Sequence, residues 1–148
     1  MLVGPCDPES AHARSLMEEL SAALAAITGD SGAASFALTD MKVARSLFVV
    51  ARGDDGAPLG CGALRPLDGD TGEIKRMYAR PGTHGVGTAV LAHLEQAAAG
   101  FGYREIWLET RRVNTRAVAF YVGQGYAEIE NYGKYAGRAE AVCFGKRL

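Results

Sequence analysis

Three closely spaced glycines in the middle of the chain are the residues whose types and spacing best suit chemistry. Gly82, Gly85 and Gly87 follow the stretch 73–79, which predicts a strand, and they precede a segment with the apolar spacing of an amphipathic helix. Residues without a Cβ let the backbone turn, and the first amides of a helix have no partner inside it. These amides also lie at the positive end of the helix dipole, where anions bind. The pattern therefore favours a phosphate site, against the alternative that the glycines only shape a strand–helix turn.

Two other phosphate-binding patterns fit this segment less well. Gly85-Val-Gly87 after a strand, with Glu109 near the end of the next strand, partly matches a dinucleotide-binding fingerprint. However, Val90 stands where the third small residue belongs, and the chain after it is too short for the remaining strands of such a sheet. A P-loop is excluded because the chain lacks its Gly-Lys-Ser/Thr sequence here.

The composition is that of a soluble globular protein. The 148 residues predict one domain, 1–148, and 48% of them are hydrophobic. A formal net charge of −1 gives no reason to expect nucleic acid or a membrane surface as a partner. Cys6, Cys61 and Cys143 are scattered and odd in number, which argues against a disulfide framework and against a metal site. Since the N-terminus also lacks a signal-peptide pattern, we expect a cytoplasmic protein.

The hydrophobic periodicity predicts the element order β-α-(α)-β-β-β-α-β-α-β-β. The expected strands cover 2–3, 47–51, 58–64, 73–79, 105–110, 126–130 and 141–146. The expected helices run from about 10 to 27, from the glycines to about 99, and from Asn114 to Gly123 or Gly125, with a short helical turn near Thr39-Asp40. This order predicts an α/β (α+β) fold, in which a mixed sheet has helices on both faces.

The glycine loop and a second motif together resemble the GNAT superfamily of acetyl-CoA-dependent N-acetyltransferases. Gly85-Val-Gly87 supplies the last three positions of the family's Arg/Gln-x-x-Gly-x-Gly/Ala loop. The stretch Asn114-x-x-Ala-x-x-Phe-Tyr121-x-x-x-Gly-Tyr126 is similar to the family's Asn-x-x-Ala-x-x-Leu/Phe-Tyr-x-x-x-Gly-Phe/Tyr, and several fixed spacings coincide there. The ending, 131–135 with 142–146, resembles a bacterial branch that acts on small molecules.

The resemblance implies a GNAT-like, mostly antiparallel sheet of about six or seven strands. It also implies acetyl-CoA as co-substrate, no metal, and direct transfer of the acetyl group in a ternary complex. The acceptor would be a primary amine of a small molecule, an amino acid or a peptide. A non-catalytic GNAT-like module that binds acyl-CoA as a sensor is the alternative. Whether the chain forms a homodimer is left open.

The resemblance also assigns residues to the co-substrate. Backbone groups of Met77 and Ala79 would pair with the pantetheine arm, and the Met77 amide would face the thioester oxygen. The amides of 82–88 would hold the pyrophosphate. The complete implied set is Met77, Tyr78, Ala79, Arg80, Gly82, Thr83, His84, Gly85, Val86, Gly87, Thr88 and Asn114. In this chain Gly82 replaces the Arg/Gln of the loop, and the loop is shorter than usual, so Arg80 or His84 is expected to supply the missing positive or donor group.

For the chemistry, the resemblance places a general acid at Tyr121 and a general base at Glu73, acting directly or through water. A phenol can protonate a leaving thiolate if it lies close to it. The alternatives are a packing tyrosine and a solvated glutamate at the start of a strand. Lys75 and Arg76 are expected at the surface or in salt bridges. The acceptor pocket is expected between the helix 10–27, the loop 29–45 and the last hairpin, with Tyr132 and Tyr135 either lining it or packing the hairpin.

Overall fold

Seven strands form one sheet in the order β1-β2-β3-β4-β5-β7-β6 in the computed structural model, which describes residues 1–148. The strands are β1 (Leu2–Pro5), β2 (Leu47–Arg52), β3 (Pro58–Pro66), β4 (Thr71–Ala79), β5 (Glu105–Arg111), β6 (Ala127–Ile129) and β7 (Ala141–Arg147). Only β4 and β5 pair in parallel, and every other neighbouring pair is antiparallel. The predicted mixed, mostly antiparallel sheet is confirmed.

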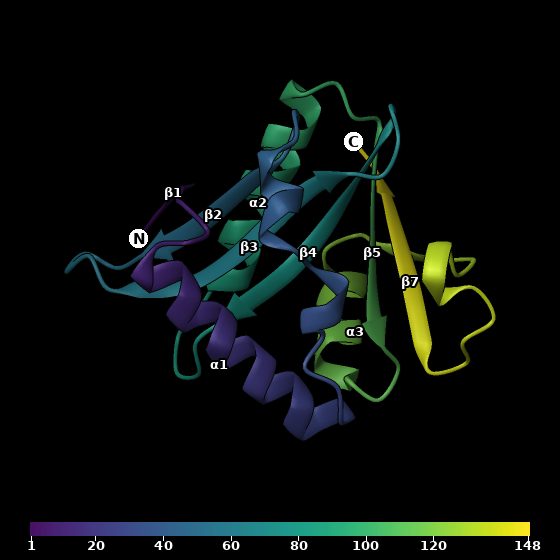
Figure 1. Cartoon of the computed structure of the whole chain (residues 1–148), viewed down its shortest axis with the longest axis horizontal. Helices are drawn as coiled ribbons and strands as arrows, with labels where there is room; N and C mark the ends of the chain where they lie inside the picture. Colours follow the sequence, from purple (N-terminus) through teal and green to yellow (C-terminus); the bar gives the residue numbers. More distant parts are fainter.

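Helices cover both faces of this sheet, as predicted. The α-helices are α1 (Ala11–Thr28), α2 (Val86–Gly100) and α3 (Thr115–Gly123), and the short 3-10 helices are η1 (Ala33–Ser35), η2 (Leu38–Lys42) and η3 (Gly133–Tyr135). Figure 1 shows α1 in front of the sheet and α2 behind it. The α1 helix begins after Ser10, whose hydroxyl accepts a hydrogen bond from the Ala13 amide at 3.3 Å. No helix in the structure combines the length and the apolar character needed to cross a membrane.

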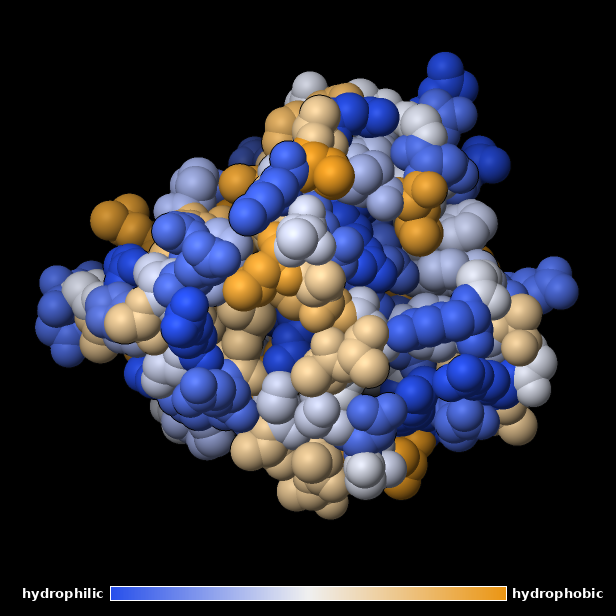
Figure 2. Space-filling view, in the orientation of Figure 1, coloured by the Kyte–Doolittle hydropathy of each residue, from blue (hydrophilic) through white to orange (hydrophobic).

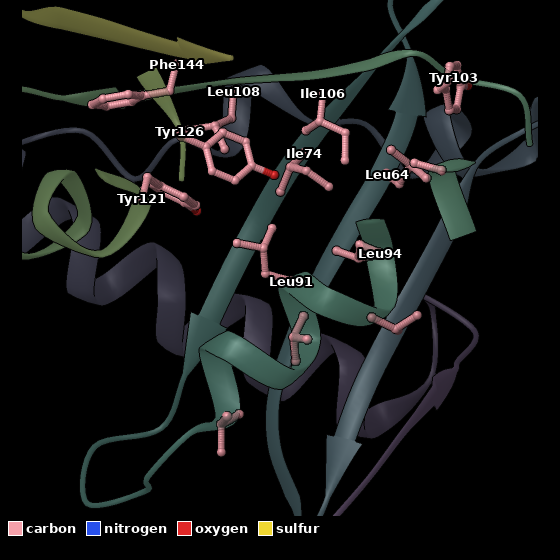
Figure 3. Packing of buried hydrophobic residues seen from close by; sticks show 14 of the residues in the cluster. Leu64, Ile74, Leu91, Leu94, Tyr103, Ile106, Leu108, Tyr121, Tyr126 and Phe144 are labelled. Atoms are coloured by element: carbon pink, nitrogen blue, oxygen red, sulfur yellow. The ribbon is translucent and has the colours of Figure 1, made fainter. Parts of the chain in front are cut away.

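Alternating side chains of the strands build two cores, one on each face. In β2, Val49 and Ala51 pack on the side of α2, whereas Phe48 and Val50 pack on the side of α1. The larger core, drawn in Figure 3, includes Leu91 of α2 and Tyr121 of α3. Because each fully buried aliphatic side chain contributes about 1.5–3 kcal/mol, this core fixes α2 and α3 firmly against the sheet.

The strands β4 and β5 separate soon after they begin. Their parallel register covers only Thr71 to Glu73 of β4, which lie opposite Glu105 to Trp107 of β5. Figure 1 shows the two strands diverging from a common end. Beyond Glu73, the edges of β4 and β5 that face one another have no ladder between them, so their backbone groups are open to another partner.

A β-bulge bends β4 next to this separation. Between the pairs Cys61–Tyr78 and Ala63–Lys75, β4 has one residue more than β3. Arg76 lies in the bulge at a φ of 55°, a conformation that costs an arginine energy. Its guanidinium is held by the Met17 and Ser31 carbonyls at 3.0 and 3.3 Å. These contacts tie β4 to α1 and to the loop that follows it.

Candidate active site

The glycine turn opens α2 with amides that have no partner in the protein. Gly85 is the N-cap at a φ of 72°, where a Cβ would be strained, and no side chain caps the helix. The first bonded amide is that of Ala89, which donates to the Gly85 carbonyl at 3.0 Å. The amides of residues 86–88 therefore remain bare at the positive end of the helix. This is the local geometry that the glycine pattern predicted.

A cavity of about 390 Å³ lies next to this turn, and we call it the glycine-loop cavity. It is lined by Leu20, Ala23, Leu24, Ile27, Met77, Tyr78, Ala79, Thr83, Gly85, Val86, Gly87, Thr88, Asn114, Arg116, Ala117, Phe120 and Tyr121. Arg116 is the only charged residue among them, and it is exposed and forms no ion pair. The cavity thus offers apolar walls, backbone amides and one free guanidinium.

A second cavity of about 170 Å³ lies between β4, β5, α1 and the loop after α1, and we call it the charged cavity. It is lined by Leu20, Leu24, Thr28, Asp30, Gly32, Ser35, Phe36, Ile74, Lys75, Arg76, Met77, Leu108, Glu109, Thr110, Arg111, Asn114, Ala117 and Tyr121. Five of these side chains are charged. The space-filling view likewise shows hydrophilic residues deep in the central hollow of this face, with apolar residues beside them (Figure 2).

The two cavities share one wall, where Tyr121 lies. Six residues line both cavities: Leu20, Leu24, Met77, Asn114, Ala117 and Tyr121. Tyr121 is only 7% exposed, and its hydroxyl makes no hydrogen bond within the protein. Figure 3 shows its ring extending from α3 among the core residues. Burial raises the pKa of Tyr121, so the phenol stays protonated. A proton donor therefore stands where the two cavities meet.

Asn114 positions the helix that carries Tyr121. It is the N-cap of α3, as predicted, and its side-chain oxygen accepts a hydrogen bond from the Ala117 amide at 3.3 Å. Close packing then sets the distance between α2 and α3, because a Cβ at Gly87 would come within 3.3 Å of the Phe120 ring. The glycine-loop motif and the tyrosine motif are thus packed closely against each other.

Glu73, predicted as the general base, lies in a buried ion-pair network. It is 1% exposed and lines neither cavity. Arg65 donates to one of its carboxylate oxygens at 2.8 Å, and the Tyr132 hydroxyl donates to the other. Arg65 also binds Asp40 of η2. With both oxygens occupied, Glu73 links β4 to η2 through Arg65 and to the last hairpin through Tyr132. It could exchange a proton with a bound molecule only through other groups.

Glu109 is a carboxylate of the charged cavity that the sequence analysis did not consider as a base. It lies in β5, its side chain is 11% exposed, and Arg111 donates to it at 2.5 Å. Burial raises the pKa of Glu109, and the nearby charge of Arg111 opposes that rise. Strand alternation is the sequence signal for Glu109. Because Ile106 and Leu108 pack in the core with α2, Glu109 points to the opposite face of the sheet.

Most residues of the predicted co-substrate set line the glycine-loop cavity, but three do not. Arg80, Gly82 and His84 lie outside its wall. The Arg80 guanidinium is held by Glu19 at 2.7 Å and by the Pro58 carbonyl at 2.8 Å. Arg80 is therefore already neutralised by the protein. Arg116, which the sequence analysis missed, is the cation that faces the cavity instead.

Lys75 departs from the expectation of a surface or salt-bridged residue. It is 8% exposed and forms no ion pair within 4.0 Å. Its ammonium donates to the Tyr135 hydroxyl at 2.6 Å. Its strand neighbour Glu73 is already paired with Arg65, which explains why the expected salt bridge does not form. Tyr132 and Tyr135 themselves line neither cavity and pack the last hairpin.

Comparison with known proteins shows which family the chain resembles. The model of the acetyltransferase (GNAT) family matches residues 13–126. An "IAA acetyltransferase" of Azospirillum brasilense is 35% identical over 91 residues, which cover 60% of this chain and 59% of that protein. The chain thus spans about three fifths of the length of this curated relative.

Solved structures share the whole fold. A Klebsiella pneumoniae structure described as an acyl-CoA N-acyltransferase superposes with a TM-score of 0.83 at 23% identity, covering 99% of this chain and 97% of that one. A GNAT family acetyltransferase from Elizabethkingia anophelis, solved with acetyl-CoA bound, has a TM-score of 0.73 at 15% identity over 99% and 97% of the two chains. The family model matches most of this chain, and the solved structures share its fold. This chain therefore belongs to the GNAT acetyltransferase family.

Proposed function

We propose that this protein is an N-acetyltransferase that moves the acetyl group of acetyl-CoA directly to the primary amine of a small molecule, an amino acid or a peptide. One observation carries the proposal. A cavity beside bare helix amides meets a cavity lined by charged side chains, and a protonated tyrosine lies at the junction. The first cavity suits a phosphate-bearing donor, and the second suits a polar acceptor.

The glycine-loop cavity fits coenzyme A by the chemistry of its wall. Its bare amides at residues 86–88 suit the pyrophosphate, and Arg116 suits a further phosphate because a guanidinium can pair with two phosphate oxygens. The open edge of β4, including Met77 and Ala79, suits the amide groups of the pantetheine arm. Bound in this way, acetyl-CoA supplies a thioester at the junction of the two cavities.

Tyr121 acts as the general acid in this proposal. As the acceptor nitrogen forms a bond to the acetyl carbon, the carbon–sulfur bond breaks and the thiolate leaves. The Tyr121 hydroxyl gives this thiolate a proton. The nitrogen releases its extra proton to solvent as the amide forms, and the phenolate regains a proton from solvent. Met77 lines both cavities, and its backbone amide would stabilise the negative charge that builds on the thioester oxygen. Each product is neutral at the reacting atoms: an amide and a thiol.

Glu109 is the better-placed general base. An ammonium must lose a proton before its nitrogen can attack, and a carboxylate with a raised pKa in the same cavity is suited to accept it. Glu73, the base implied by the sequence resemblance, remains the alternative. It would require a proton relay, since its two oxygens are bonded to Arg65 and Tyr132. Mutating each glutamate separately distinguishes the two assignments.

The test is thiol release from acetyl-CoA in the presence of a panel of amines, amino acids, polyamines, aminoglycosides and peptides. Mass spectrometry of the acceptor should show one added acetyl group for each thiol released. Calorimetry with acetyl-CoA, run in parallel, identifies the non-catalytic alternative, because a sensor module would bind acetyl-CoA and release no thiol with any acceptor. Failure to bind acetyl-CoA at all would overturn both.

A further inference from the structure

Lys75 of β4 and Glu109 of β5 lie on either side of the gap between the two strands. The parallel register pairs Glu73 with Trp107, so its continuation would place Lys75 opposite Glu109. The ladder stops at Glu73, however, and the two side chains form no ion pair within 4.0 Å. Both instead line the charged cavity. The wall of one cavity therefore holds an ammonium and a carboxylate that form no ion pair with each other.

The Lys75 ammonium has unused hydrogen-bonding capacity. An ammonium has three N–H donors, and only one is used, by the Tyr135 hydroxyl at 2.6 Å. The pKa of Lys75 is lowered, mainly by burial and further by the charge of Arg65, although the negative charges of Glu73 and Glu109 oppose this shift. Glu73 does not take up the remaining donors, because Arg65 and Tyr132 occupy its oxygens. Two N–H groups of a buried cation are thus free to meet an acceptor in the cavity.

The rest of the cavity wall offers no spare anion to Lys75. The two carboxylates of the wall, Asp30 and Glu109, both pair with Arg111, at 3.6 and 2.5 Å. Arg76 is bonded only to neutral groups: two carbonyls and the Ser21 hydroxyl. Two of the three cations of the wall therefore lack a carboxylate partner, whereas neither of its anions lacks a cation. A ligand that brings a negative charge would correct this imbalance.

From this arrangement, and resting on the proposed function, we propose that the acceptor is a small amino acid or a similar compound with a carboxylate close to its amine. Lys75 binds the carboxylate, and Glu109, on the opposite strand, receives the ammonium and removes its proton. A plain amine would bring a positive charge to a wall that already has unpaired cations, so it would bind less well. The cavity volume of about 170 Å³ limits the acceptor to a small one.

The first test uses the unmodified protein. Glycine, alanine, serine, β-alanine and γ-aminobutyrate are each compared with the corresponding primary amide, which retains the amine and the size but lacks the negative charge. We expect kcat/KM to be about tenfold or more higher for the carboxylate than for the amide, for at least one spacing of amine and carboxylate, because one charge-assisted contact is worth about that factor. Equal values, or higher values for the amides, at every spacing would overturn the proposal.

The second test compares two lysines beside the same ring. Lys75 and Lys134 lie 5.3 and 5.6 Å from the centroid of the Tyr135 ring, but only Lys75 lines the charged cavity. Lys75→Met should reduce the carboxylate-to-amide ratio to near one, whereas Lys134→Met should leave the ratio as it is in the unmodified protein. A Lys75→Met variant that retains the full ratio would contradict the assignment of Lys75. If Lys75→Met does not fold, the acceptor series in the unmodified protein still decides the question.

The outcomes separate this inference from the proposed function. If amines are acetylated but carboxylates and amides react equally well, the acetyltransferase stands and the carboxylate site does not exist. If no acceptor releases thiol from bound acetyl-CoA, the proposed function itself fails. Calorimetry of acetyl-CoA with Lys75→Met should give the Kd of the unmodified protein, since Lys75 does not line the glycine-loop cavity. A changed Kd would show that Lys75 acts on the co-substrate and would overturn its role in acceptor binding.

Discussion

The two cavities differ in how their walls can recognise a ligand. The glycine-loop cavity offers bare amides, apolar side chains and the single charge of Arg116, whereas the charged cavity brings together five charged side chains in a smaller volume. Backbone amides can bind the same donor in many sequences, as long as glycines and a helix start are present. Side-chain charges select a ligand by its sign and size. Under the proposed function, the first cavity would therefore serve a general co-substrate and the second would determine acceptor specificity.

The largest expected effect comes from the residue that joins the two cavities. Tyr121→Phe removes only the hydroxyl, so we expect the fold and the Kd of acetyl-CoA to be unchanged. The kcat should fall by about 10²–10⁴-fold, the range for loss of a positioned acid. Steady-state thiol release with a good acceptor measures this change. An unchanged kcat would make Tyr121 a packing residue and would leave the junction without a proton donor.

The next effect distinguishes the two glutamates. Glu109→Gln should lower kcat by about 10²-fold, at the lower end of the range for a general base, because solvent can still remove protons from the amine. The loss should be smaller at high pH, where more of the free amine is already neutral. A pH profile of kcat/KM measures both features. A profile like that of the unmodified protein would remove Glu109 from the mechanism.

Glu73→Gln is the matched control for that experiment. It breaks a buried pair and should destabilise the fold by about 3 kcal/mol, near the lower limit for such changes, because Arg65 keeps Asp40 as a partner. Urea unfolding measures this loss. The kcat per folded molecule should stay within about threefold of the unmodified value, since Glu73 lines neither cavity. A large loss of kcat with little loss of stability would instead return the role of base to Glu73.

A third effect concerns binding in the glycine-loop cavity alone. Arg116→Ala should weaken acetyl-CoA binding by about tenfold or more, as expected for one charge-assisted phosphate contact. Arg80→Ala is the control, because Glu19 already neutralises that arginine, and it should leave Kd nearly unchanged. Calorimetry at two salt concentrations compares them, and the Arg116 effect should shrink at high salt. The reverse order of effects would restore Arg80 as the phosphate contact.

Sequence reasoning located the fold and the glycine-loop cavity better than the charged cavity, for a physical reason. Gly85, Gly87 and Asn114 act locally, through turn geometry and a helix cap, so their spacing alone predicts where they lie. The partners of a charged side chain come from distant parts of the chain. The sequence predicts a phosphate contact for Arg80 because Glu19, about sixty residues away along the chain, cannot be recognised from the sequence as its partner.

The same limit explains the choice of base. Strand alternation predicts the face of the sheet to which Glu73 and Glu109 each point. It does not show which of the two carboxylates lines a cavity. The distinction depends on where β4 and β5 separate, just beyond Glu73. Residues before that point are covered by the ladder and by Arg65, while Glu109 lies beyond it. Register and strand separation are properties of the assembled sheet, so only the structure supplies them.

The smallest expected effect is a stability change that tests the environment of Glu109 without any substrate. Burial raises its pKa in the folded protein above the unfolded value, so the folded state binds the proton more tightly. Its contribution to stability is therefore fully present below the unfolded pKa and is lost as the pH rises through the folded pKa. Glu109→Gln does not titrate and should not show this loss. Relative to the unmodified protein, the variant should thus gain stability as the pH rises from about 4, near the unfolded pKa, to neutral pH.

Urea unfolding of both proteins across that pH range measures the difference, and taking the difference cancels the titration of the other carboxylates. Among these, Glu19 and Asp30 have lowered pKa values, held down mainly by hydrogen bonds from Arg80 and from the Gly32 amide, and they act in the opposite direction. If the variant instead loses stability as the pH rises, the ion pair with Arg111 outweighs burial. Glu109 would then be an ordinary paired carboxylate with a low pKa, poorly suited to accept a proton. The charged cavity would then have no general base, and Tyr121 would be the only residue of the two cavities with a proposed part in proton transfer.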